Sequence, residues 1–74
     1  MSKNDIGDNA GVIWCLLEKY GAMSIHEIEK YTLMQQSNTF LALGWLAREN
    51  KINFFEKEGV LYVELFDTSF RHYF

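Results

Sequence analysis

The sequence has no proline and only one cysteine, Cys15, among its 74 residues. A single cysteine cannot close an internal disulfide, which fits a reducing compartment, and we expect a cytoplasmic protein. The chain also lacks a long apolar run, so no membrane-spanning segment and no membrane partner are predicted. Its first residues lack the apolar stretch of a secretory signal.

Basic residues are scarce and scattered. Seven lysines and arginines stand against ten acidic residues, which gives a formal net charge of −3. Proteins that hold nucleic acid through its phosphates usually present a basic face, because neutralising phosphates supplies most of the affinity. Here the basic residues lie along the whole chain with acidic residues close by, a pattern typical of a mixed, solvated surface.

Patterns that support catalysis or metal binding are missing as well. Cys15, next to Trp14, is interpreted as a buried structural cysteine. His26 is interpreted as a solvated surface histidine, because no second ligand stands at metal spacing. There is no glycine-rich phosphate loop, and a chain this short is expected to lack a ligand pocket of roughly 300 Å³. We therefore predict no enzyme activity, no cofactor, no metal site and no catalytic residue.

The chain is instead rich in apolar residues, with 49% hydrophobic and 16% aromatic side chains. A chain of this length buries only about 60% of its unfolded surface and so needs a dense core, which this composition supplies. We predict one domain over 1–74, with a core over about 5–66 and an aromatic tail at 67–74.

Apolar residues at spacings of three and four predict a first helix whose inner stripe contains Ile6, Ala10, Ile13, Trp14 and Leu17. Asn4 or Asp5 is expected to cap its start, and Gly21 to end it. Gly7 and Gly11, one turn apart inside the helix, are interpreted as places where another element packs closely against bare backbone.

The second and third helices follow from capping signals. Ser24 and Glu27 match a capping box and predict a short helix over 24–31. A tight turn then leads to a third helix over about 35–49, with Asn50 at its end because asparagine tolerates a positive φ. A short strand directly before the second helix is compatible with this pattern.

The period then changes to two residues, and 52–56 and 60–66 are predicted to be strands joined through Gly59. One face of this hairpin is expected to pack on the core through Leu61, Val63 and Leu65. The opposite face is unusually apolar for a solvent side and carries Phe55, Val60 and Tyr62.

This order of elements predicts an α+β winged helix-turn-helix fold, three helices followed by a β-hairpin wing. The segments 41–52 and 6–11, together with Trp14, resemble a family of small bacterial winged helix-turn-helix proteins of uncharacterised function. The resemblance covers about 6–65 and implies this fold and, by analogy, DNA binding. It supplies no established ligand and no functional residue.

DNA binding is the first functional hypothesis. In a winged helix the N-terminal half of the third helix reads base edges in the major groove. That place is occupied by polar residues that can hydrogen-bond bases, namely Gln35, Gln36, Ser37, Asn38 and Thr39. Arg48 is grouped with them, and Lys51 and Lys57 are expected to touch phosphate. The predicted protein is a DNA-binding module, as in a transcriptional regulator, with duplex DNA as its partner.

The third helix is apolar nearly all round, which favours a second hypothesis. Its core stripe is expected to contain Phe40, Leu43, Leu46 and Ala47. Trp45 then either folds back onto the first helix or the wing, or forms an exposed patch with Leu41 and Gly44.

An exposed apolar patch of this kind is typical of a surface that binds another protein. With Phe55 and Tyr62 of the hairpin, it is a candidate interface for a second copy of the chain or for another protein. The wing tip also carries Glu56 and Glu58, whose carboxylates would repel phosphate. Both functions stay open from the sequence.

Overall fold

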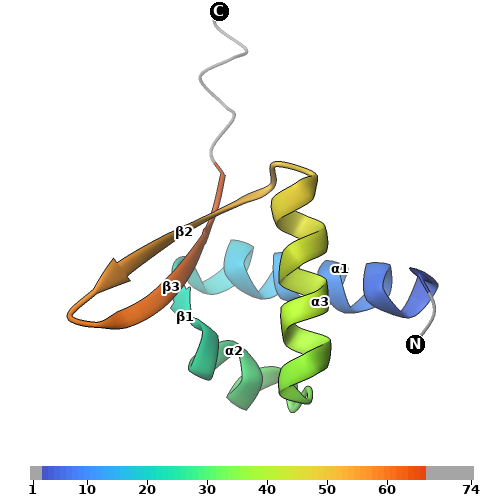
Figure 1. Ribbon diagram of the computed structural model, residues 1–74, viewed down its shortest axis with the longest axis horizontal. Helices are drawn as coiled ribbons and strands as arrows, with labels where there is room; N and C mark the ends of the chain where they lie inside the picture. The colour runs from blue at the N-terminus through green and yellow to red at the C-terminus, as the bar shows by residue number, and fades with distance from the viewer. Residues whose placement is uncertain (1–2, 67–74) are drawn as a thin grey trace, which may run out of the picture.

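The computed structural model describes residues 3–66, which form three helices and a three-stranded antiparallel sheet (Figure 1). The elements, in chain order, are α1 (Lys3–Tyr20), β1 (Met23–Ser24), α2 (Ile25–Thr32), α3 (Gln36–Arg48), β2 (Ile52–Lys57) and β3 (Val60–Leu65). The sheet has the order β1-β3-β2, so the short strand ahead of α2 pairs with the hairpin. This confirms the predicted order of elements and includes the short first strand. The predicted aromatic tail at 67–74 lies outside the described residues.

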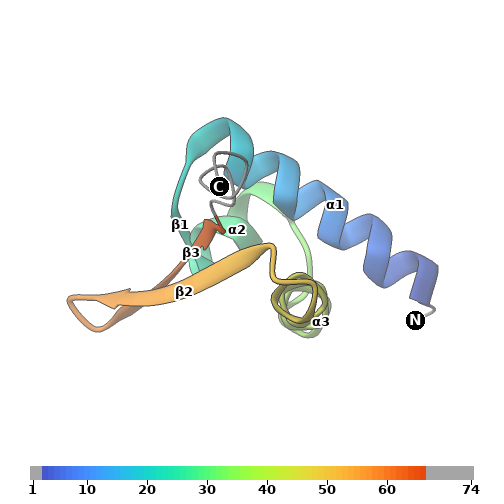
Figure 2. The same cartoon turned by 90° about the horizontal axis from the view of Figure 1, so that it is seen from above.

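Figures 1 and 2 show how these elements are layered. α3 and the β2–β3 hairpin lie side by side on one side of the molecule, and α1 lies behind them. The core between these layers consists of Ala10, Ile13, Leu17, Met23, Ile28, Ala42, Leu43, Leu46, Ile52 and Val63. Every helix and every strand contributes to it, so the apolar residues of the whole chain converge on one core. No helix within residues 3–66 has both the length and the apolar character to cross a bilayer.

α1 is placed by its inner stripe and by its C-terminal glycine. Gly21 has a φ of 81° and its N–H donates to the Leu17 carbonyl at 2.8 Å, as expected for a helix-ending glycine. The prediction that Asn4 or Asp5 precedes the helix was wrong, because α1 already begins at Lys3. Asp5 lies in the first turn instead, where the helix dipole favours a negative charge.

The capping box at the start of α2 is confirmed. The Glu27 N–H donates to Ser24 Oγ at 3.1 Å, and the Ser24 N–H donates to Glu27 Oε1 at 2.9 Å. Two amides that no helical carbonyl can satisfy are therefore bonded, and the start of α2 is fixed directly after β1.

The turn between α2 and α3 contains a leucine in the left-handed region. Leu33 has a φ of 59°, and its N–H donates to the Glu29 carbonyl at 2.8 Å. The Thr32 hydroxyl donates to the Ile28 carbonyl at 2.7 Å and accepts the Met34 N–H at 3.2 Å. These bonds hold a backbone conformation that costs a residue with a Cβ about 1 kcal/mol or more.

The end of α3 is fixed by a Schellman arrangement of hydrogen bonds. Asn50 has a φ of 57°, as expected, and its N–H donates to the Ala47 carbonyl at 3.0 Å. The Lys51 N–H donates to the Leu46 carbonyl at 2.9 Å. Because β2 starts at the next residue, this turn sets the direction in which the hairpin leaves α3.

The hairpin turns at Glu58 and Gly59, which both have positive φ, the signature of a tight two-residue turn. Val63 is fully buried as expected, but the prediction that Leu61 joins the core was wrong. Leu61 lies next to the turn, in the part of the hairpin that extends past the helices (Figure 1). Its side chain is therefore 40% exposed.

Candidate nucleic-acid interface

The N-terminal end of α3 presents polar side chains to solvent. Gln35 is the N-cap residue and makes no side-chain capping bond, and Gln36 and Ser37 are also exposed. Asn38 is half-buried. The first turn contains no acidic residue, so its free backbone N–H groups remain available to an acceptor or an anion. Four of the five predicted base-contacting residues therefore keep at least part of their side chains accessible.

The fifth, Thr39, was predicted wrongly. Its side chain is 0% exposed, and its hydroxyl donates to the Gln35 carbonyl at 3.2 Å. Phe40, which was expected in the core stripe, is 48% exposed instead. Leu43 and Leu46 are buried, as predicted. The inward stripe of α3 also includes Ala42, so it is rotated away from Phe40 and toward Thr39. Hydrophobicity alone favoured Phe40 for the inward position, whereas the small Thr39 fits against the close-packed core.

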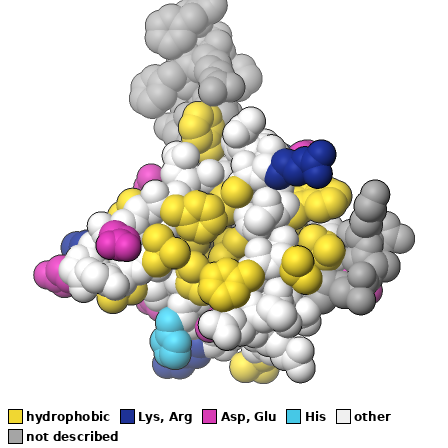
Figure 3. Space-filling view, viewed as in Figure 1, with side chains coloured by type: hydrophobic (Ala, Val, Ile, Leu, Met, Phe, Trp, Pro, Cys, Tyr) yellow, Lys and Arg dark blue, Asp and Glu magenta, His cyan; other side chains and the backbone are white. Residues whose placement is uncertain are grey.

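The outward side of α3 is mainly apolar. Leu41 and Trp45 are 49% and 40% exposed, and the bare backbone of Gly44 is exposed between them. Figure 3 shows hydrophobic side chains gathered over α3 and the neighbouring part of the hairpin. Trp45 is therefore not a core residue, but it also lines a groove beside α1, so each of the two alternatives left open by the sequence holds in part.

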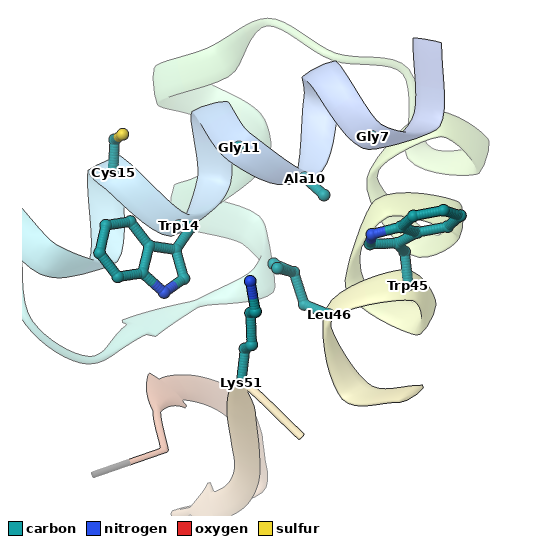
Figure 4. Close-up of a pocket in the computed structure, with 8 residues that line it drawn as sticks. All are labelled: Gly7, Ala10, Gly11, Trp14, Cys15, Trp45, Leu46 and Lys51. Carbon is teal, nitrogen blue, oxygen red and sulfur yellow. The ribbon is translucent and has the colours of Figure 1, made fainter. Parts of the chain in front are cut away.

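The predicted basic contacts do not gather into one patch. Arg48 is exposed at the C-terminal end of α3, roughly 18 Å along the helix axis from Gln36. Lys57 is exposed at the wing tip between Glu56 and Glu58. The Lys51 side chain instead extends toward α1, where it lines a groove (Figure 4).

A groove of about 340 Å³ lies between α1 and α3 (Figure 4). It is lined by Gly7, Ala10, Gly11, Trp14, Cys15, Trp45, Leu46 and Lys51. The expectation that so short a chain has no room for a pocket of this size was wrong. Gly7 and Gly11 leave space here, because a Cβ built on either would meet no atom within 4 Å.

Two further predictions fail at this groove. The expected close packing of an element against Gly7 and Gly11 is absent within the described part of the chain. Cys15 is exposed rather than buried, because the inward positions of α1 are taken by Ile13 and Leu17 on either side of it. His26 is exposed, as predicted. No cluster of three or more metal-ligating side chains occurs among residues 3–66.

The predicted protein interface is divided between two surfaces. Phe55 and Tyr62 are cross-strand partners whose rings stack with centroids 5.4 Å apart. The strand register places them on the sheet face opposite buried Ile52 and Val63. Each ring covers part of the other, so this pair is half-buried, unlike the open apolar side of α3.

The structure has three helices, a β-hairpin wing that pairs with a short first strand, and a third helix exposed beside that wing. These features define a winged helix-turn-helix domain. Residues 1–65 match the family described as the winged helix-turn-helix domain DUF2582, and the chain belongs to that family. The predicted family resemblance and fold are thereby confirmed.

The chain is also similar to another protein and to two solved structures. The chain is 46% identical over 50 residues to the uncharacterized protein MJ1608 of Methanocaldococcus jannaschii, covering 64% of this chain and 70% of that protein. The solution structure of BT2368 from Bacteroides thetaiotaomicron is similar with a TM-score of 0.80 and 38% identity, over 93% of this chain and 88% of that one. HlyU from Vibrio cholerae has a TM-score of 0.65 and 19% identity over 99% and 89% of the two chains, a likeness of fold alone.

Proposed function

We propose that this chain is a DNA-binding module that places the N-terminal end of α3 against the base edges of duplex DNA. The observation that carries the proposal is the exposed polar end of the helix, formed by Gln35, Gln36 and Ser37. α3 and the wing lie on the same side of the molecule, so both can face one duplex (Figure 2). Glutamine can pair with adenine through two hydrogen bonds, and serine can reach bases or phosphates.

The charges indicate that this binding depends little on phosphate. Arg48 and Lys57 are the basic residues that α3 and the wing tip present, and Glu56 and Glu58 oppose them at the tip. Each neutralised phosphate adds about 0.9 to the slope of log affinity against log salt, so we expect a slope of magnitude about 2. Selective, weak binding of this kind suits a transcriptional regulator working in the cytoplasm, and it requires no catalytic step.

The test is an NMR titration of the chain with mixed-sequence duplex DNA at low salt. We expect the amide signals of residues 35–38 to shift, and the variant Gln36→Ala to weaken binding severalfold. Lys57→Ala should reduce the salt slope by about 1. Lys19→Ala is the matched control, because Lys19 is an exposed lysine on α1 and should leave the slope unchanged. Unmoved amides at 35–38 would exclude this function.

A second function is favoured by one observation, the apolar outward side of α3. Phe40, Leu41 and Trp45 keep 40–49% of their surface exposed, whereas a helix lying in the wet groove of DNA is expected to present a broader polar face. Exposed aromatic and aliphatic groups of this kind form the centres of protein interfaces.

This alternative is a protein-interaction module, with a second copy of the chain as the simplest partner. Light scattering at high protein concentration tests it, and Leu41→Lys supplies the matched variant because Leu41 is not in the core. A dimer that Leu41→Lys dissociates supports this function. A strict monomer excludes the second copy as the partner.

A further inference from the structure

The groove between α1 and α3 is lined largely by apolar and aromatic side chains and is large enough for a small molecule. Trp14 of α1 and Trp45 of α3 stand at its two ends, with Ala10 and Leu46 between them (Figure 4). Its volume of about 340 Å³ lies within the usual range of ligand pockets. A second hollow of about 240 Å³ adjoins it at Trp14 and Lys51.

The groove borders open backbone on α1. Gly7 and Gly11 each cost the helix about 1 kcal/mol relative to alanine. No neighbour within residues 3–66 requires their small size, since a Cβ on either would meet nothing within 4 Å. A flat molecule lying against this stretch of backbone would make use of the missing side chains.

The charge in the groove has one sign. Lys51 is the only ionisable group with a full positive charge among the described lining residues of the two hollows, and none of those residues is acidic. Its amine extends into the groove beside Leu46 and Trp14 (Figure 4). The Schellman turn holds the Lys51 backbone through the hydrogen bond to the Leu46 carbonyl, so the base of this side chain is fixed. A cation between apolar, aromatic walls complements a ligand with a flat apolar body and one negative group.

We infer that this groove binds a small planar aromatic carboxylate. The ring system lies between Trp14 and Trp45 over the bare backbone of Gly7 and Gly11, and the carboxylate accepts hydrogen bonds from Lys51 Nζ. This site is separate from the N-terminal end of α3, so it can exist whether or not the chain binds DNA.

The experiment uses 2-naphthoate as the probe and its neutral amide, 2-naphthamide, as a control of the same shape. The chain has two tryptophans, and both line the groove, so their indole N–H signals report directly on the site. We expect naphthoate to shift both indole signals and the Gly7 and Gly11 amides in a saturable way. Naphthamide should bind roughly three- to fivefold more weakly, the usual worth of one partly solvated charge contact.

Two variants separate charge from shape. Lys51→Gln should remove the preference for naphthoate over naphthamide, while Lys57→Gln, at the distant wing tip, should keep it. Gly11→Leu should fill the groove and weaken both probes more than tenfold. Because the space above Gly11 is open, the core signals of this variant should match those of the natural chain.

Three results would overturn the inference. The first is an absence of shifts at the indoles and at Gly7 and Gly11 with millimolar naphthoate. The second is equal affinity for the acid and the amide in the natural chain. The third is a set of nuclear Overhauser contacts in the free protein between the groove residues and residues 67–74, which would show that the chain's own end occupies the groove. The DNA titration is read at residues 35–38, so failure of one proposal leaves the other measurable.

Discussion

Both sides of α3 carry apolar side chains, but only one side is packed into the core of the chain. The inward side, with Thr39 and Leu43, is packed against α1 and is 0–1% exposed at these two residues. The outward side carries Leu41, which is 49% exposed. Trp45 lies at the edge of this side, where it lines the groove beside α1 and is 40% exposed. Apolar character on this helix therefore does not by itself place a residue in the core.

Leucine at two positions of the same helix provides the largest test of this comparison. Leu43→Ala should lower the free energy of unfolding by about 3 kcal/mol, because it opens a cavity in the core. Leu41→Ala should change it by less than about 0.5 kcal/mol, since Leu41 is half exposed. Urea denaturation measures both. Equal losses in the two variants would mean that the outward side is buried in the protein as it exists in solution, for example against a second copy.

The hydroxyl residues of α3 provide the next test. Thr39→Ala should cost about 1.5 kcal/mol, from the lost burial of its methyl group and the lost bond to the Gln35 carbonyl. It should leave DNA affinity unchanged. Ser37→Ala, on the exposed side, should leave stability nearly unchanged and weaken DNA binding. The prediction is refuted if Ser37→Ala lowers the free energy of unfolding in denaturation and Thr39→Ala weakens DNA binding in the titration.

Most of the fold could be predicted because its signals are local. The Ser24–Glu27 capping box, the left-handed Asn50 and the Gly59 turn each depend on a few neighbouring residues, and all three are present as expected. Hydrogen bonds between residues close in the sequence can be predicted without knowing how distant elements pack. The order of helices and strands follows from these capping and turn residues.

The surface of α3 and the groove could not be predicted in the same way. Whether Thr39 or Phe40 faces inward depends on how α1 packs against α3, and periodicity locates such a stripe only to within about one residue. The groove combines Gly7 and Trp14 of α1 with Trp45 and Lys51, which lie far along the chain. Only the packed structure shows that the two glycines line open space rather than a tight contact.

Leu33, in the turn that leads into α3, is an exposed leucine whose effect on stability is expected to come from its backbone and not from its side chain. Leu33 is 87% exposed and has a φ of 59°, so its side chain contributes little to packing while its backbone is strained. Leu33→Gly should raise the free energy of unfolding by about 0.5–1 kcal/mol. Leu33→Ala is the matched control and should change little, because alanine keeps the strain. If alanine stabilises the protein as much as glycine does, the leucine side chain rather than the backbone is responsible.

The hairpin turn combines a strained backbone with a charge, and substitutions there are expected to have the smallest effect on stability. Glu58 has a φ of 54° beside Gly59, a position where asparagine is favoured over glutamate. Glu58→Asn should stabilise the chain by about 0.5 kcal/mol in denaturation and, by removing one carboxylate from the wing tip, should tighten DNA binding slightly. Glu58→Gln removes the same charge without the favoured turn residue, so it should tighten DNA binding alone. A gain in stability from glutamine equal to that from asparagine would assign the effect to repulsion between Glu56 and Glu58 and not to the backbone.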